Sequence, residues 1–575
     1  MKKRKLVSLL LSGALVFGLL AGCGGGTQEG GNSPAPQGSE TPSAGGEPFE
    51  MTLNIASEPQ SIDPALNTAV DGAIMLSHMF EGLMRWADSG AETPGSNGTC
   101  NNAELVPGQA ESEPDKVVNE DGTVTYTFKL REDAKWSDGK PVTAQDFVFT
   151  WQRLVNPETA ADYSYMIDCV VNAKEIMAGE KDPSELGVKA VDEKTFEVTL
   201  ATDLPYFLEI CAFPAVFPVR EDIVSDPQWT YKPETYVSNG PYKMTIRETN
   251  SQIVMEPNEN YYGVADLGPS KLTFKLMEDA NAMLNGFKTG ELNFIEQMPT
   301  DEIAGLMTSG ELKIVDYIGT YYVCYQTQKA PFDDPRVRKA FTLAIDRTYI
   351  VNEITQTGQV EAGGFVPAGV YDAVGATGDD FRTTGGDYYA PTDADYEANC
   401  EEARKLLAEA GFPNGEGFPV VEYLYNTDDS HKAVAEALQS MWQNVLGVTV
   451  TLNNQEWATF LQTRKDGDYS IARNGWIADY NDPMSFLDMW LTGGGNNDAQ
   501  YTNAEYDAKI QAAKAETDPA ARMQLLHEAE DIIMGQDYAL CPLYFYTQKY
   551  MLTDGIEGMY YTPLGYFFFD HCTKG

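Results

Sequence analysis

The stretch VVEYLYNTDDSHKAVAEALQSMWQNVLGVTVTL (Val420–Leu452) decides the fold class. Val420–Tyr425 is a short apolar run typical of a strand, and Val448–Leu452 is a second one. Between them, Ser430–Leu446 has helical periodicity and stops at Gly447; its apolar face comprises Val434, Leu438, Met441, Trp442 and Val445. Strand, helix and strand of these lengths predict a crossover between parallel strands. The fold class is therefore α/β.

Further elements are expected on both sides of this unit. Alternating apolar residues predict strands at 51–55, 123–130 and 195–200. Asp138-Gly139 predicts a hairpin turn, and Thr143 with Asp146 predicts a helix start. Two more helices, near 503–516 and 519–535, precede a strand at 540–546. At over 500 residues, the body should form more than one lobe.

The first residues have the pattern of an exported protein. A positive start, Met1–Lys5, precedes the apolar run Leu6–Leu20, which is too short for a membrane-spanning helix of roughly twenty residues. The run ends in Leu20-Ala21-Gly22-Cys23, and small residues before a cysteine resemble the bacterial lipobox. We therefore expect a signal peptide at 1–22 and lipidation of Cys23. An ordinary signal peptide followed by an accidental cysteine is the alternative.

Residues 23–49 are rich in Gly, Ser and Pro and contain almost nothing that could pack in a core. Such a linker is flexible, with a mean reach of about 30 Å. A lipid next to a linker suits a globular body held close to a membrane face. Because one acyl chain anchors weakly, we expect the multi-chain modification of a lipobox cysteine.

Composition argues against several classes of function. A formal charge of −46 disfavours nucleic acid and anionic lipid surfaces, although a solvated acidic surface accounts for much of it. Four His, no CxxC spacing and no HExxH motif argue against a metal site, and no cofactor is expected. GxSxG, and SxxK with its partner motifs, are absent as well, so an enzyme is not expected.

Several ordered motifs resemble one known family. They are SEPQSIDPA (Ser57–Ala65), WSDGKPVTAQDFVFTWQRL (Trp136–Leu154), TQKAPFDDPRVRKAFTLAIDR (Thr327–Arg347), ARKLLAEAGF (Ala403–Phe412) and ARNGWIADYNDP (Ala472–Pro483). Together they are similar to the solute-binding proteins of peptide ABC importers, and among these to the oligopeptide-binding proteins. The resemblance covers nearly the whole chain from residue 50.

The resemblance implies a two-lobed, periplasmic-binding-protein-like fold with an additional domain, hinged around a ligand cleft. Domain I would comprise 50–80, 220–319 and 547–575, domain II 81–219, and domain III 320–546. The two stretches 87–112 and 363–396 look like insertions, and we expect both on the surface.

The implied function is capture of oligopeptides by hinge closure and their delivery to the permease subunits of an importer. The protein would be a monomer, lipid-anchored at the extracellular face of the bacterial cytoplasmic membrane. Because the same fold binds other ligands, an oligosaccharide-binding member of the family remains an alternative. An exported hydrolase and a surface adhesin are more distant ones.

A receptor for many peptides must bind what peptides share, namely the ammonium terminus and the extended backbone. By resemblance, Asp479 binds the ammonium, Gly475 and Ile477 pair with the peptide backbone, and Val70 contacts the peptide from the other side. Asp479 could instead be a turn residue, but Asp482, directly before Pro483, is the better helix cap. Gly475 could instead be a close-packing position.

The remaining candidate residues match side-chain pockets and polar positions of the family. Trp457, Trp476 and Tyr163 match aromatic pocket positions, although each could be a core residue. Arg464, Arg473 and His431 match polar positions that meet peptide carboxylates or ordered water, although Arg473 could pair with an acid inside its lobe. Tyr322 and Cys324 belong to a run in which a thiol replaces a carboxylate, which puts selectivity for basic side chains at that pocket in doubt.

Overall fold

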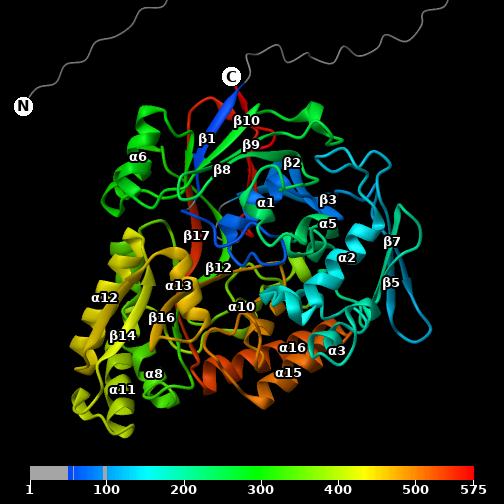
Figure 1. The fold of residues 1–575 in the computed structure, drawn as a ribbon. Coiled ribbons are helices and arrows are strands. Elements are labelled where there is room, and N and C mark those ends of the chain that lie inside the picture. The colour runs from blue at the N-terminus through cyan, green and yellow to red at the C-terminus, as the bar shows by residue number, and fades with distance from the viewer. Residues whose placement is uncertain (1–48, 56, 95–99) are drawn as a thin grey trace, which may run out of the picture. The chain divides into compact units, whose positions relative to one another are not determined.

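The computed structural model describes residues 49–55, 57–94 and 100–575, which lie in one compact unit (Figure 1). Its largest sheet has eleven strands. Ten follow one path, in the order β15 (Val450–Gln455), β14 (Val421–Asn426), β16 (Ile471–Ile477), β12 (Lys313–Tyr325), β17 (Leu540–Leu552), β11 (Phe294–Ile295), β1 (Glu50–Asn54), β10 (Lys271–Lys275), β9 (Gln252–Pro257) and β8 (Tyr242–Glu248), while β13 (Val360–Glu361) pairs with β17.

The predicted crossover unit is confirmed. Strands β14 and β15 pair in parallel from Val421↔Val450 onward, and helix α12 (Asp429–Leu446) connects them. The helix begins where the Asp428 carboxylate accepts the backbone N–H of His431 and ends at Gly447 with φ +71°. The buried side chains of α12 include Val434, Leu438 and Trp442. The α/β class follows directly from this unit.

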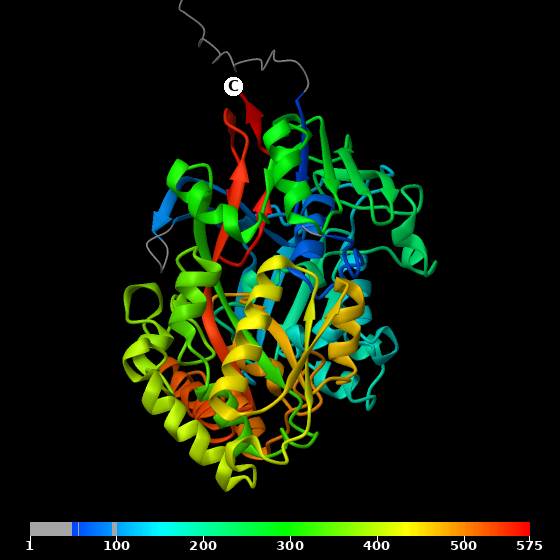
Figure 2. The ribbon, with the colours of Figure 1, turned by 90° about the vertical axis from the view of Figure 1, so that its left-hand side faces the viewer.

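Two long antiparallel strands run between the upper and the lower part of the large sheet (Figures 1 and 2). β12 and β17 have thirteen residues each, and their register shifts between Asp316 and Thr320 and again between Tyr321 and Tyr322. Such irregularities bend a strand. The predicted domain boundaries at 319/320 and 546/547 fall inside these strands, and the three-domain division itself stays a prediction.

The range predicted as domain II contains a separate four-stranded sheet, ordered β4 (Asp115–Val118), β5 (Val124–Lys129), β7 (Thr195–Leu200) and β6 (Val188–Ala190). Helix α2 (Ala144–Val155) packs on it and begins as predicted, because the Asp146 carboxylate accepts the backbone N–H of Thr143 at 2.8 Å. Trp136 is fully buried next to the predicted turn, at which Gly139 has φ +85°.

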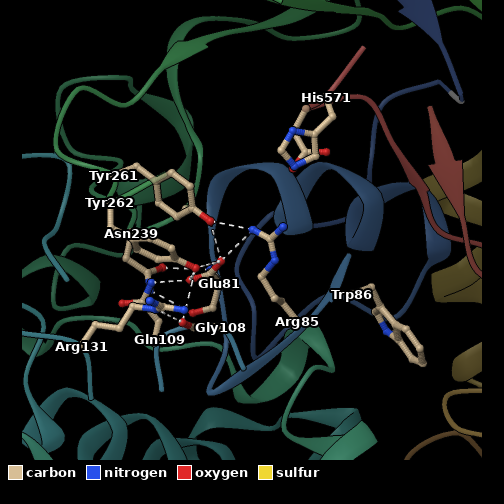
Figure 3. Close-up of polar contacts among 12 residues, drawn as sticks. Glu81, Arg85, Trp86, Gly108, Gln109, Arg131, Asn239, Tyr261, Tyr262 and His571 are labelled. Atoms are coloured by element: carbon tan, nitrogen blue, oxygen red, sulfur yellow. Dashed lines mark hydrogen bonds and ion pairs between the residues drawn. The ribbon is translucent and has the colours of Figure 1, made fainter. Parts of the chain in front are cut away.

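A buried carboxylate joins this range to the loop after β9 (Figure 3). Glu81 accepts hydrogen bonds from the hydroxyls of Tyr261 (2.7 Å) and Tyr262 (2.9 Å) and from Gln109 Nε2 (2.7 Å). Arg85 Nη1 completes the set at 3.3 Å. Hydrogen bonds to a buried charge are stronger than neutral ones. The Glu81 cluster therefore ties the start of the range predicted as domain II to the loop after β9.

One expectation about insertions is wrong. Segment 363–396 was expected on the surface, yet Phe365, Val366, Val370 and Phe381 are completely buried in the main core. The described residues of segment 87–112 include most of β2 (Met84–Pro94) and all of β3 (Cys100–Pro107), which pair antiparallel. Six cysteines are free and buried: Cys169, Cys211, Cys324, Cys400, Cys541 and Cys572. The predicted signal peptide, Cys23 and nearly all of the linker lie outside the described residues.

Candidate functional site

A cavity of about 330 Å³ lies where segments from all three predicted domains meet. Its size is in the range of small-ligand sites. Ten of the twelve predicted ligand-binding residues line it, namely Val70, Tyr163, His431, Trp457, Arg464, Arg473, Gly475, Trp476, Ile477 and Asp479. The fold therefore brings together residues that are up to 409 positions apart in the sequence (479 − 70 = 409).

Asp479 follows the end of β16 and is held from two directions. Its backbone N–H donates to Ser485 Oγ at 2.8 Å, and its Oδ1 accepts the Tyr163 hydroxyl at 3.2 Å. The neighbouring acid has a different role, because Asp482 forms a two-pronged ion pair with Arg522, both contacts at 2.8 Å. Asp482 Oδ1 also accepts the N–H of Met484 at 2.9 Å, in keeping with the predicted capping.

The environment of Asp479 disfavours its charge. Burial, together with the charge of Asp488, raises the pKa of Asp479 well above its ordinary value, against hydrogen bonds from Tyr163 and Ser485. Within the described part of the chain, no Lys, Arg or His forms an ion pair with Asp479. A cation that enters the cavity would therefore stabilise the ionised carboxylate.

One edge of β16 is left open beside Asp479. The strand pairs with β12 along its whole length, from Gly319↔Ile477 to Tyr325↔Ile471. Its pairing with β14 is limited to Ile471 and Ala472. From Arg473 to Ile477, no described strand occupies that second edge. Such an edge can accept an extended chain through backbone hydrogen bonds.

Gly475 lies in the middle of this edge and has little room for a side chain. A Cβ there would lie 2.5 Å from Tyr546 Oη, so the tyrosine would have to shift. The Gly475 N–H donates to Asn474 Oδ1 at 2.8 Å, and Asn474 Nδ2 in turn donates to Asp498 Oδ2 at 3.1 Å. The glycine therefore packs closely against Tyr546, and its N–H already has a partner inside the protein.

Aromatic rings surround the open edge. The Trp476 indole N–H donates to the carbonyl oxygen of Ser485 at 2.7 Å, and its ring centroid lies 6.2 Å from that of Tyr163. Tyr163 packs against Phe213 at 5.0 Å, and Trp457 packs near Phe460 at 5.9 Å. Ser485 thus positions both Trp476 and Asp479.

The three basic residues predicted for the site differ in whether a nearby acid pairs with them. Arg464 is paired, with Nε 2.6 Å from Asp498 Oδ2. Arg473 donates to Tyr546 Oη at 3.3 Å and has no ion pair among the described residues. Burial, with the charge of Arg473, lowers the pKa of His431 to about 3, so its ring is neutral. Arg473 is therefore the free cation of the three.

Two predicted residues lie elsewhere. Tyr322 is completely buried against Phe365 and Trp490, and Cys324 is buried with its sulfur 3.2 Å from Tyr469 Oη. Neither lines the cavity. The resemblance placed them there, but β12 is covered on both faces at this point.

Other cavity residues were missed. Tyr317, Tyr546 and Tyr566 line the cavity, and Asp71 and Glu296 contribute carboxyl groups. Tyr546 ends the strand predicted at 540–546, where alternation alone offers two faces and does not say which one meets the cavity. For Asp71 and Glu296 the sequence holds no local signal.

Direct contacts close the cavity between the predicted second and third domains. Lys465 Nζ lies 2.5 Å from Asp162 Oδ1. The rings of Tyr206 and Tyr480 stack in parallel with centroids 4.1 Å apart. These contacts require the two segments to be in their closed arrangement.

Comparison with known proteins identifies the family. The family model of the bacterial extracellular solute-binding proteins, family 5 middle, matches residues 104–498. The chain belongs to this family. The periplasmic oligopeptide-binding protein OppA of Salmonella typhimurium is a solute-binding relative, 36% identical over 515 residues, which are 88% of this chain and 89% of that protein.

Two solved structures of the family bear on the conformation. The complex of Haemophilus influenzae OppA with the peptide RPPGFSPFR has a TM-score of 0.81 at 33% identity, covering 92% of this chain and 99% of that one. The unliganded open form of the murein tripeptide-binding protein MppA has a TM-score of only 0.58 at 31% identity, covering 92% and 98%. At similar identities, this solute-binding protein matches the peptide complex more closely than the unliganded open form.

Two kinds of feature are absent from the described residues. No group of three or more His, Cys, Asp or Glu side chains there is arranged to hold a metal ion. None of the helices there has the length and apolarity needed to cross a bilayer.

Proposed function

We propose that this protein is the extracellular substrate-binding lipoprotein of an ABC importer and that it captures oligopeptides by hinge closure. Among the relatives above, one is an oligopeptide-binding protein and another forms a complex with a peptide. The observation that carries the proposal is the buried carboxylate of Asp479, without a cation, at the end of an open strand edge.

In this proposal, the peptide ammonium pairs with Asp479 and the extended backbone joins the open edge at Gly475 and Ile477. Val70, at the start of α1 (Val70–Met79), contacts the peptide from the other wall. Arg473, the free cation, meets a carboxylate of the ligand. The protein does not change the peptide chemically. Its role consists of binding the peptide, closing around it and releasing it to the permease.

Cys23 carries the lipid, and the linker up to residue 49 lets the monomeric body reach the permease at the outer face of the cytoplasmic membrane. The linker's mean reach of about 30 Å suits that task.

Thermal unfolding with tripeptides, with cellobiose and without ligand tests the proposal. A ligand of the folded state raises stability by RT ln(1 + [L]/Kd), about 2.7 kcal/mol at one hundred times Kd. Peptides should raise the melting temperature, and cellobiose should not. A rise with cellobiose alone would favour the oligosaccharide alternative, which has no use for Asp479.

A further inference from the structure

Several acids line the cavity besides Asp479, and two of them, Asp71 and Glu296, each have a buried oxygen without a hydrogen-bond partner among the described residues. Asp71 lies in the first turn of α1, and Glu296 directly follows β11. Both line the cavity. Asp71 Oδ2 and Glu296 Oε1 are shielded from solvent and have no hydrogen-bond partner among the described residues. Because buried polar atoms are almost always paired, the two atoms indicate a missing donor.

The two carboxyl groups are close enough for the charge of Asp71 to act on Glu296. Burial raises the pKa of Asp71 to about 6, and the charge of Glu58 adds to the rise. Burial also raises the pKa of Glu296 to about 8, against a hydrogen bond from Gln548 and the charge of Lys549, and the charge of Asp71 adds to the rise. Like charges that share a buried site disfavour ionisation of both.

The cations around this pair do not neutralise it. Within the described residues, neither Asp71 nor Glu296 forms an ion pair. Lys549 lies on β17. Burial lowers its pKa, although the charges of Asp428 and Glu296 act in the opposite direction. Gln548 Nε2 reaches Glu296 Oε2 only at 3.5 Å. Of the basic side chains that line the cavity, Arg464 pairs with Asp498 and Lys465 with Asp162. Arg473 and His431 also line it, but among the described residues neither forms an ion pair with Asp71 or Glu296.

This acidic pair is separate from the proposed ammonium site. Asp479 follows β16, and Glu296 follows β11. In the large sheet, β12 and β17 lie between these two strands, so the two acids lie at different places along the cavity. One ligand cation cannot serve both.

We propose that Asp71 and Glu296 form a subsite for a basic side chain, lysine or arginine, of the bound peptide. The inference rests on the proposed peptide-binding function and adds the class of side chain that one subsite prefers. An ammonium or guanidinium group brings several N–H donors and a positive charge to the two unpartnered oxygens. The preference for basic side chains, which Cys324 puts in doubt at its own position, thus has a different structural basis.

Matched tetrapeptides test the subsite. In an all-alanine tetrapeptide, each position in turn carries lysine or norleucine, which has a similar length but no charge. Titration calorimetry at pH 7 should show, at one position, binding of lysine at least about tenfold tighter than norleucine. Lysine binding there should also release close to one proton, measured in buffers of different ionisation enthalpy, because the cation ionises a carboxyl group with a pKa of about 8.

Three variants locate the effect. Glu296→Gln should reduce the lysine-to-norleucine ratio below about twofold and abolish the extra proton release, while norleucine peptides keep their affinity. Asp71→Asn should lower the ratio in the same direction. Glu291→Gln, an exposed acid of the same segment outside the cavity, is the matched control and should change neither quantity.

Each outcome has a defined meaning. Tight peptide binding with a ratio near one at every position overturns the subsite but leaves the proposed function standing. A lysine preference that persists in the Asp71→Asn, Glu296→Gln double variant also overturns it. If none of the peptides binds the unaltered protein, the proposed function fails, and the subsite fails with it.

Discussion

The Tyr163 hydroxyl donates a hydrogen bond of 3.2 Å to Asp479 Oδ1, joining two residues that are 316 positions apart. Tyr163 belongs to the range predicted as domain II, and Asp479 to the range predicted as domain III. The bond therefore depends on the closed arrangement, in which it helps a carboxylate to bind a ligand cation. It connects closure of the cleft to recognition of the ligand.

Tyr163→Phe removes this bond and keeps the ring that packs near Trp476. A hydrogen bond to a charged group contributes about 1.5–3 kcal/mol, so peptide affinity should fall about 10- to 150-fold in calorimetry. Tyr165→Phe is the control, because the Tyr165 hydroxyl contacts Asn496 instead. Equal losses in both variants would contradict the role of Tyr163.

Asp479→Asn removes the proposed partner of the peptide ammonium. Truncating one member of a buried charge pair costs about 2–5 kcal/mol, so affinity should fall roughly 30- to 5000-fold. Acetylating the peptide N-terminus should weaken binding to the unaltered protein strongly and to the variant much less. Calorimetry on the four combinations measures the coupling, and additive losses would show that Asp479 does not contact the ammonium.

The raised pKa of Asp479 also makes a prediction for the ligand-free protein. The folded carboxyl group binds its proton more tightly than the unfolded one, whose ordinary pKa is 3.8. Stability from this group is therefore present at low pH and is lost as pH rises through the raised pKa. Asp479→Asn should melt at a higher temperature than the unaltered protein at pH 8, and the difference should vanish near pH 4. A variant that melts lower at both pH values would contradict this.

The proposed hinge makes a prediction for solution scattering. Because the described arrangement resembles a peptide complex, the ligand-free protein should open in solution, and saturating peptide should reduce its radius of gyration. Buffer with the same concentration of cellobiose is the control. An unchanged curve with peptide would indicate a rigid binder.

Anchorage can be tested apart from binding. Cys23→Ala should move the protein from membranes to the medium, because the lipidated thiol is the only anchor that we propose. Immunoblots of membrane and medium fractions measure this, with Cys400→Ala, a buried cysteine of the body, as control. A variant that remains on membranes to the same extent would refute the lipoprotein assignment.

Local features were predictable from the sequence because they depend on neighbouring residues. The β14–α12–β15 unit follows from spacing alone, and the start of α2 from Thr143 and Asp146. Segment 363–396 was wrongly expected on the surface, because its Gly and Asp residues dominate the composition. The buried side chains, Phe365 and Phe381 among them, are few and irregularly spaced.

The residues of the cavity could be predicted only by resemblance, because tertiary structure brings them together. Ten residues carried over by resemblance line it, and their roles stay predictions. Tyr322 and Cys324, also carried over by resemblance, do not line it, because β12 is buried on both faces where they lie. Asp71 and Glu296 are two acids among 86, and only folding brings them to one cavity. No rule of local spacing relates positions so far apart.

The Glu81 cluster has a mechanical consequence. The hydroxyls of Tyr261 and Tyr262 bind Glu81 across the junction between the range 81–219 and the β8–β10 end of the large sheet, so these two parts should turn together as one rigid arm. If bending occurs at β12 and β17, the motion then has a single degree of freedom, an angle between two rigid arms. One pair of distance labels, with one probe on each arm, would record the entire capture cycle.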